Sequence, residues 1–331
     1  MAEIRLSRSK KVLLINFSGD SMKKIIIVGG PTATGKTALG VNLARYFNGE
    51  IISADSMQNY REMNIGTATP SDEEMCGIKH YLINECEPED EYNVAVFKKK
   101  ANENINKITS EGKIPIIVGG TGLYIDALLY DYHLGSTSQN TAIKEELEKK
   151  LTQYGAQYMY GLLQQIDPEE AKRIHKNNTK RVLRALQIYY VNQETKSKNV
   201  QQKLPVFNYA YIALNFEPRL ILYERINQRV DDMFNQGLLD EVYKLYKKGC
   251  TEKNNSMQAI AYKELLAYFR GKTALEETKE LIKKRTRNYA KRQLTWFRNN
   301  KDVKFFTVNE YLSKQELYLE IIHYVKERLN I

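Results

Sequence analysis

A glycine-rich run near the start of the chain has the composition and spacing of a phosphate-binding loop. Residues 30–37 read Gly-Pro-Thr-Ala-Thr-Gly-Lys-Thr and match the pattern G-x-x-x-x-G-K-[ST] at every position. The glycines allow the backbone to turn its N–H groups inward, and Lys36 can reach a terminal phosphate as a point charge. The hydroxyl of Thr37 can bind Mg²⁺, which we expect as a cofactor. We therefore predict that a diphosphate is bound by Gly30, Pro31, Thr32, Ala33, Thr34, Gly35, Lys36 and Thr37.

A carboxylate follows the next predicted strand. P-loop nucleotide hydrolases hold Mg²⁺ with an aspartate at a strand end, and Asp55, just after the strand Glu50–Ser53, is the candidate for that position. Its carboxylate could instead act as a general base, or it could cap a turn, as the pair Asp55-Ser56 would favour. The residues leave these roles open. They also leave the ligand open, because ATP is common in P-loops but any diphosphate fits the same anion site.

Alternating strands and helices must position these residues. The loop follows Lys24–Val28, a β-branched run typical of a buried strand, and precedes an expected helix over Thr37–Phe47. A further helix over Ala95–Glu111 leads to the strand Ile114–Val118. This alternation predicts a parallel sheet with right-handed crossovers. The fold class is therefore α/β, a P-loop NTPase-like core with a parallel sheet flanked by helices.

The region from 131 to 205 differs in character from the core. It is polar and helical, with helices expected over Ala142–Tyr160 and Pro168–Val191, so we predict an inserted all-helical subdomain. The sheet resumes at Tyr209–Leu214, and a late strand is expected at Val303–Thr307. Between these strands, helices are expected over Leu220–Leu245, Ser256–Phe269 and Thr273–Asn299. The predicted parts are an extension (1–21), the core with its C-terminal helices (22–130 and 206–331) and the helical insertion (131–205).

Charge is unevenly distributed along the chain. Residues 1–130 carry 15 basic and 16 acidic side chains, a net charge of −1, whereas residues 131–331 carry 35 and 24, a net charge of +11. A basic half beside a neutral half is typical of a protein that binds a polyanion, nucleic acid before membrane. Solvation of Lys-rich helices would explain the same excess.

Cysteine usage and hydropathy indicate a compartment. Cys76, Cys86 and Cys250 lack metal-type spacing and suit a reducing cytoplasm. No apolar run approaches the roughly 20 residues of a membrane span. No coiled-coil heptads require a partner chain. We expect a cytoplasmic monomer that does not contact membranes.

Seven motifs, in this order and spacing, resemble those of the tRNA dimethylallyltransferases, also called tRNA isopentenyltransferases. The motifs are Gly30–Thr37, Asp55–Gln58, Asn64–Pro70, Val118–Tyr124, Asn178–Leu186, Arg229–Met233 followed by Gly237–Leu238, and Arg287–Arg298. The resemblance covers about residues 24–300, and its last motif is not required by a generic P-loop kinase. One departure is Ala261, which stands where the family usually has glycine.

The resemblance implies a reaction and roles for residues. The family transfers a dimethylallyl group from its diphosphate to the exocyclic amine of the adenine 3′ to the anticodon. Asp55 would accept the amine proton or orient the amine, Arg229 would clamp the diphosphate, and Thr121 would lie beside the reacting groups. The partners would be tRNA and dimethylallyl diphosphate.

Contacts with tRNA are also implied by the resemblance, in two places. Asp55, Ser56, Met57 and Gln58 would touch the RNA near the target base. The helical insertion would contribute Lys180, Arg181, Val182, Leu183 and Arg184.

The late helix is the third expected RNA-binding segment. From Lys283 to Arg298 it has basic residues and no acidic one, and we assign Arg287 and Lys291 to phosphate contacts. Ile282, Tyr289 and Trp296 recur every seven residues and are expected to pack inward.

Three rival functions remain open on the sequence. An adenylate prenyltransferase would keep the P-loop and Asp55 but would not need the basic second half. A P-loop small-molecule kinase would use ATP and ignore tRNA. A silent RNA-binding protein would not need Lys36, Thr37 or Asp55.

Overall fold

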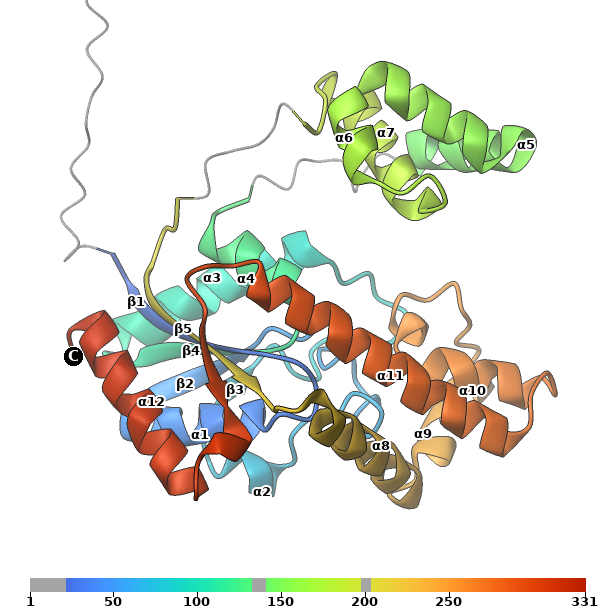
Figure 1. Ribbon diagram of the computed structural model, residues 1–331. Helices are drawn as coiled ribbons and strands as arrows, with labels where there is room; N and C mark the ends of the chain where they lie inside the picture. The colour runs from blue at the N-terminus through green and yellow to red at the C-terminus, as the bar shows by residue number, and fades with distance from the viewer. Residues whose placement is uncertain (1–21, 133–140, 198–203) are drawn as a thin grey trace, which may run out of the picture.

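The computed structural model describes residues 22–132, 141–197 and 204–331, and it has a parallel sheet with helices on both faces (Figure 1). The six strands lie in the order β3-β2-β4-β1-β5-β6, and every pairing is parallel. The strands are β1 (Lys24–Gly29), β2 (Gly49–Ser53), β3 (His80–Tyr81), β4 (Ile114–Val118), β5 (Asn208–Asn215) and β6 (Lys304–Thr307). The α/β P-loop fold expected from the sequence is confirmed.

Alternating residues of β1 face two separate hydrophobic cores. Ile26 and Val28 face a core completed by α1 (Lys36–Tyr46) and α12 (Lys314–Leu329). Ile25 and Ile27 face the opposite core. The helices on that face include α3 (Val94–Ser110), α4 (Gly122–Leu129) and α11 (Leu275–Arg298). Both faces of the strand are therefore buried, as its continuous apolar sequence requires.

The inserted segment forms three helices with a core of their own, and the first of them is kinked at Gly155, whose φ of 79° and ψ of 173° are not helical. They are α5 (Thr141–Ile166), α6 (Pro168–Arg173) and α7 (Thr179–Asn192), which lie together and apart from the sheet in Figure 1. Their shared core contains Leu147, Leu163, Val182 and Leu186, among other side chains. The predicted helical insertion is thus present, while residues 1–21 and the ends of its linkers, 133–140 and 198–203, lie outside the described residues.

Besides the expected helix Ala142–Tyr160, which is kinked at Gly155, three helices expected to be continuous are each broken. The stretch Pro168–Val191 divides into α6 and α7, because Asn178 caps α7 by accepting a hydrogen bond from the backbone N–H of Arg181 at 3.3 Å. The stretch Leu220–Leu245 divides into α8 (Arg219–Asn235) and α9 (Leu238–Lys247). Gly237, at a φ of 100°, makes that break, and such an angle favours glycine.

The third break lies within Ser256–Phe269. A short 3₁₀ turn, Ser256–Gln258, is followed by α10 (Tyr262–Phe269), which begins after Ala261. The sequence did not predict the helices α4 and α12, nor the short elements α2 (Asp72–Met75) and β3. No helix in the described ranges has the length and hydropathy needed to cross a bilayer.

The inward stripe predicted on α11 holds only in part. Ile282 is buried, whereas Trp296 is 37% exposed and rests its indole against the start of α4 at Gly122. Positions seven apart on a straight α-helix drift by about 20° per repeat, so the stripe turns away from the core by its third member.

Ala261 adopts a backbone conformation that is strained for any residue with a side chain. Its φ is 79° and its ψ is −50°, and it is 2% exposed. We predict that Ala261→Gly raises the free energy of unfolding by about 1 kcal/mol, because glycine removes the clash with its own Cβ. Urea denaturation of the two proteins measures the difference.

Ala259→Gly is the matched control for that prediction. Ala259 is also buried, but its φ of −58° and ψ of 145° are ordinary for alanine. The control should lose about 0.5–1 kcal/mol of stability through added freedom of the unfolded chain. Equal losses in both variants would contradict the assignment of strain to Ala261.

Candidate active site

The P-loop joins β1 to α1 at the carboxyl edge of the sheet, where α/β folds bind ligands. Gly30 has a φ of 123°, and a Cβ on it would lie 2.6 Å from the carbonyl oxygen of Leu214 on β5. Within the loop, the hydroxyl of Thr34 donates to the carbonyl of Pro31 at 2.9 Å, and Thr34 is 2% exposed. The loop therefore has a fixed shape that only glycine permits at its first position.

Two cations and one carboxylate share this site. Burial and, after it, the charge of Arg229 lower the pKa of Lys36 to about 7, against the opposing effect of Asp55. Burial likewise lowers the pKa of Arg229. Burial raises the pKa of Asp55, which the Met57 backbone N–H and Lys36 partly offset. Two positive groups beside a single carboxylate form a site whose electrostatics favour an added anion.

Helix α8 supplies arginines to the P-loop from the side of β5. Arg229 Nη1 lies 3.5 Å from the hydroxyl of Thr32, so the arginine predicted to clamp the diphosphate lies beside the P-loop. Arg225, one turn earlier, donates from Nε to the carbonyl of Ala33 at 2.9 Å and stacks on Phe216 at 4.6 Å. Arg225 was missed from the sequence, although its four-residue spacing from Arg229 was a usable signal.

Asp55 and Thr121 lie together because β2 and β4 are neighbours. The backbone N–H of Thr121 donates to the carbonyl of Ala54 at 3.2 Å, and the Thr121 hydroxyl accepts from the N–H of Ser56 at 3.2 Å. Asp55 Oδ1 accepts from the N–H of Met57 at 2.9 Å. Thr121 is thus hydrogen-bonded to the two residues on either side of Asp55, which holds the two predicted catalytic residues close together.

Helix α11 ties the P-loop to the Thr121 turn, a link that the sequence did not suggest. The side chain of Gln293, 5% exposed, accepts from the N–H of Thr32 at 3.0 Å and donates to the carbonyl of Gly120 at 3.0 Å. Tyr289, one turn earlier, lies near Asp55 and Thr121, and burial followed by Asp55 raises the pKa of its phenol. The amphipathic stripe of α11 was the one signal for this face.

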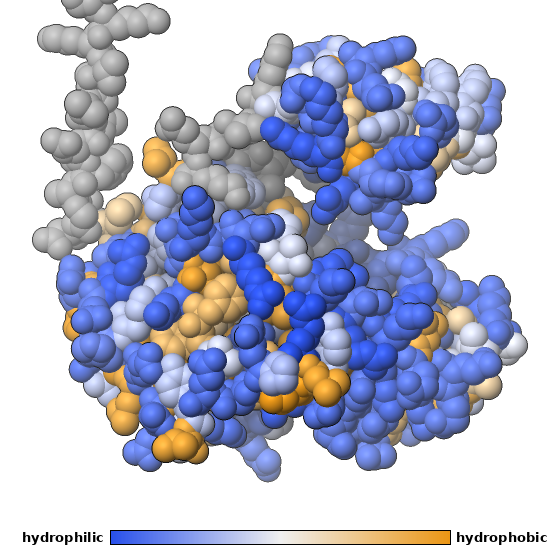
Figure 2. Space-filling model, in the orientation of Figure 1, coloured by the Kyte–Doolittle hydropathy of each residue, from blue (hydrophilic) through white to orange (hydrophobic). Residues whose placement is uncertain are grey.

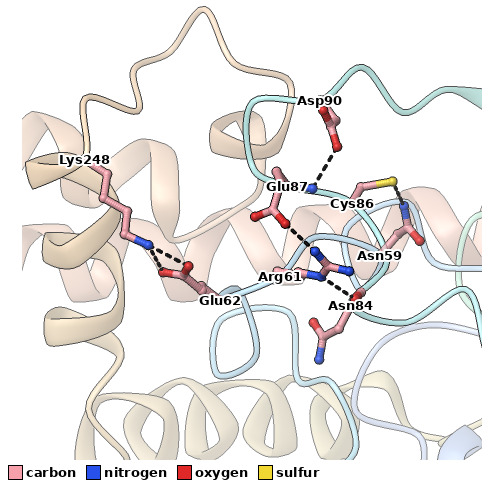
Figure 3. Close-up of polar contacts among 8 residues, drawn as sticks. All are labelled: Asn59, Arg61, Glu62, Asn84, Cys86, Glu87, Asp90 and Lys248. Atoms are coloured by element: carbon pink, nitrogen blue, oxygen red, sulfur yellow. Dashed lines mark hydrogen bonds and ion pairs between the residues drawn. The ribbon is translucent and has the colours of Figure 1, made fainter.

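The loop after Asp55 is held to the segment that follows β3. The N–H of Asn84 donates to the carbonyl of Gln58 at 3.0 Å, and that of Arg61 donates to the carbonyl of Cys86 at 2.8 Å. Side chains add to this pairing (Figure 3), with Asn59 donating to Cys86 Sγ at 2.8 Å. Glu62 at the far end of the loop pairs with Lys248 at 2.6 Å.

Gln58 is not free to read a base in this conformation. Its Oε1 accepts from the hydroxyl of Ser53 at 2.9 Å. Its Nε2 donates to the carbonyls of Ala68 at 3.1 Å and Thr67 at 3.4 Å. Gln58 therefore anchors its own loop, while Ser56 and Met57 remain partly exposed.

The predicted RNA-binding residues of α7 fall on two faces. Lys180, Arg181 and Arg184 are exposed, whereas Val182 is 1% exposed in the helical core and Leu183 packs against that core. The side chains of Val182 and Leu183 therefore pack within the helical insertion instead of facing solvent. In the view of Figure 2, this part of the molecule has a largely hydrophilic surface.

Contacts within the protein occupy part of the basic run on α11. Arg287 donates to Asn227 Oδ1 at 2.5 Å, whereas Lys291 is exposed and available to a phosphate. Arg285 pairs with the buried Glu264.

Comparison with known proteins relates this chain to a single enzyme family. A family model described as IPP transferase matches residues 58–300. The tRNA dimethylallyltransferase of Thermoanaerobacter sp. (strain X514) is 46% identical over 313 residues, which are 93% of this chain and 99% of that protein. The tRNA dimethylallyltransferase of Bacillus cytotoxicus is 45% identical over 310 residues, 93% of this chain and 96% of that one.

Solved structures agree with this relationship. A crystal structure of the full-length tRNA isopentenylpyrophosphate transferase of Bacillus halodurans has a TM-score of 0.69 and 41% identity, covering 92% of this chain and 98% of that one. A eukaryotic dimethylallyltransferase acting on tRNA has a TM-score of 0.75 and 31% identity, covering 90% and 78%.

The bridge made by Gln293 gives a prediction on stability. Gln293→Leu leaves the N–H of Thr32 and the carbonyl of Gly120 without their partner, so the free energy of unfolding should fall by about 2 kcal/mol. Urea denaturation measures this loss.

Asn288→Leu is the control, since Asn288 is an exposed amide on the same helix. It should change stability by less than about 0.5 kcal/mol. Similar values for both variants would show that the Gln293 bridge contributes little.

Proposed function

Because this chain belongs to the tRNA dimethylallyltransferase family, we propose that it transfers a dimethylallyl group from dimethylallyl diphosphate to the exocyclic amine of adenine 37 of tRNA. The product is isopentenyladenosine, and the second product is diphosphate. The observation that carries this proposal is the partly buried pair Lys36 and Arg229 at the P-loop, beside Asp55 and Thr121. A leaving diphosphate needs cations and an attacking amine needs a proton acceptor, and the two kinds of groups must lie side by side.

On the diphosphate side, the P-loop binds the anion from Gly30 to Thr37. Lys36 and Arg229 stabilise the negative charge that grows as the bond between the allylic carbon and the diphosphate oxygen breaks. Charge development is confined to a partly buried site, where such interactions are stronger than in water. Bound diphosphate would also favour the charged form of Lys36, whose pKa is about 7 without it.

On the acceptor side, the amine nitrogen forms a bond to the allylic carbon and loses a proton. Asp55 accepts that proton or orients the amine, and its pKa, raised by burial, makes it a better base than an exposed aspartate. Thr121 fixes the backbone of Ser56 and so the start of the loop that meets the RNA. The base must leave the anticodon-loop stack to reach this site, at a cost of a few kcal/mol.

Oxygen donors at the P-loop fit Mg²⁺. Across the described parts of the chain, no three His, Cys, Asp or Glu side chains gather to hold a metal by themselves. Mg²⁺ commonly uses one or two protein oxygens together with substrate phosphates. Thr37 at the start of α1 would hold it with the diphosphate, and the ion would neutralise charge on the leaving group.

Basic side chains away from the reacting groups bind the tRNA in this proposal. Lys180, Arg181 and Arg184 on α7 contact phosphates of the tRNA, together with Lys291 and Arg287 on α11. These contacts position the RNA and leave base reading to the residues near Asp55. The enzyme acts in the cytoplasm as a monomer.

A transfer assay tests the proposed function. Labelled dimethylallyl diphosphate and Mg²⁺ are incubated with the protein and unmodified tRNA, and in parallel with free AMP and ATP. We expect label in tRNA alone. Label in a free nucleotide would indicate an adenylate prenyltransferase, and hydrolysis of ATP without prenyl transfer would indicate a kinase-like P-loop enzyme.

Asp55→Asn serves as the inactive reference in this assay. It should lower kcat by about 100-fold or more while tRNA binding persists, because the lost group acts on the proton. Glu73→Gln removes an exposed carboxylate from α2 and should leave the rate unchanged. Normal turnover by Asp55→Asn would exclude Asp55 as the base.

The salt dependence of tRNA binding tests the helical insertion. Removing Lys180 and Arg181 together, each by substitution with alanine, should weaken binding and reduce the slope of log affinity against log salt by about 0.7–0.9 for each lost phosphate contact. The control is the double variant Lys301→Ala/Lys314→Ala, which removes two exposed positive charges from the α/β part of the protein. An unchanged slope in the α7 variant would place the RNA contacts elsewhere.

A further inference from the structure

One carboxylate on α9 collects four hydrogen-bond donors from other parts of the chain. Glu241 Oε2 accepts from the backbone N–H groups of Asn64 and Ile65, both at 2.8 Å. Glu241 Oε1 accepts from the N–H of Gly66 at 3.1 Å and from the hydroxyl of Tyr262 at 2.5 Å. Hydrogen bonds to a charged acceptor are the strong ones, so this carboxylate fixes three successive amides in one orientation.

The ring of Tyr262 packs against the same segment, at Gly66. A Cβ on Gly66 would lie 2.5 Å from the ring, so the loop backbone lies directly against the Tyr262 side chain. Tyr262 is fully buried at the first position of α10. Burial and then Glu241 raise the pKa of its phenol well above the usual value, which keeps the hydroxyl protonated as a donor.

The segment that Glu241 holds leads straight to the loop of Asp55. The next two residues after Gly66 are Thr67 and Ala68, whose carbonyls accept both N–H bonds of Gln58. The other end of the Gln58 amide meets Ser53, at the end of β2. A continuous set of hydrogen bonds therefore runs from α9 through residues 64–68 to the residues on either side of Asp55.

We propose that Glu241 is a positioning residue for the tRNA side of the reaction, acting through residues 64–68 on Gln58 and the loop after Asp55. The inference rests on the proposed function, because it assigns that loop to the RNA. Glu241 touches neither reacting group by this route. It sets the conformation in which the loop presents Ser56 and Met57.

The diphosphate side has separate supports, which makes the effect of Glu241 selective. The P-loop is held by Arg225 of α8 and by Gln293 of α11. No hydrogen bond of Glu241 in the described ranges reaches residues 30–37. Loss of the Glu241 carboxylate should therefore weaken tRNA use and spare dimethylallyl diphosphate binding.

Glu241→Gln is the test variant, because it keeps the shape and removes one acceptor. Each oxygen of Glu241 serves two donors, so the NH₂ group of glutamine must face two donors whichever way it is turned. We expect the KM for tRNA to rise about tenfold, the loss of roughly one charge-assisted hydrogen bond. We expect the KM for dimethylallyl diphosphate to stay within about twofold.

Two further variants complete the series. Tyr262→Phe removes one of the four donors while retaining the ring against Gly66, and it should shift the KM for tRNA in the same direction by less. Asp240→Asn removes the adjacent, exposed carboxylate from the same helix turn and should behave as wild type.

Hydrogen exchange and tRNA affinity provide readouts that do not need turnover. In Glu241→Gln, the amides of residues 64–66 should exchange faster than in the wild type, and the Kd for tRNA should rise with the KM. Wild-type protein that binds tRNA without transferring label would count against the proposed function, and the tRNA affinity of Glu241→Gln would still decide the inference.

Two results with the Glu241→Gln variant would overturn the inference while leaving the proposed function in place. In one, Glu241→Gln keeps the wild-type KM and Kd for tRNA. In the other, the KM values for both substrates rise together, which would make Glu241 a general support of the fold. Wild-type protein that neither binds tRNA nor transfers label would overturn the inference together with the proposed function.

Discussion

Like charges held close together beside a single carboxylate are the constraint on which the rest of this site depends. Burial lowers the pKa of both Lys36 and Arg229, the charge of Arg229 adds to the shift of Lys36, and Asp55 offsets only part of it. Such an arrangement persists when the surrounding structure fixes the groups in place. A bound diphosphate supplies the missing negative charge, so the protein is preorganised for that ligand instead of being stabilised by its own charges.

Strand order explains how one edge of the sheet serves two substrates. β1 lies between β4 and β5, so its P-loop has a different neighbour on each side. Arg229 approaches from the β5 side through α8, whereas Asp55 and Thr121 approach from the β2 and β4 side. Glycines permit the close approaches, since a Cβ on Gly119 would lie 2.2 Å from the carbonyl oxygen of Ala54. The topology therefore places the residues proposed for the leaving group and those proposed for the acceptor on opposite sides of the P-loop, close to one another.

Local signals in the sequence were sufficient for the P-loop and for five of the six strands in the described sheet, but not for β3 or for the supports around the site. Gly30 to Thr37 and the strand ahead of it are contiguous, so pattern and chemistry coincide there. Gln293 meets Thr32 across 261 positions, a contact that no periodicity encodes. Arg229 was identified through a family resemblance, because a lone arginine on a helix is usually solvated. The predicted helix ends were wrong where a single residue, such as Ala261, takes a backbone angle that composition does not predict.

Counting basic residues overestimates the surface available to RNA. The second part of the chain has a net charge of +11, yet several cations of α11 hold the helix in place. Arg285 neutralises the buried Glu264, and Arg298 pairs with Glu217 at 3.2 Å. Arg285 and Arg298 are therefore already paired within the protein, whereas Lys291 is exposed and available to a phosphate, so the net charge alone does not locate an RNA-binding surface.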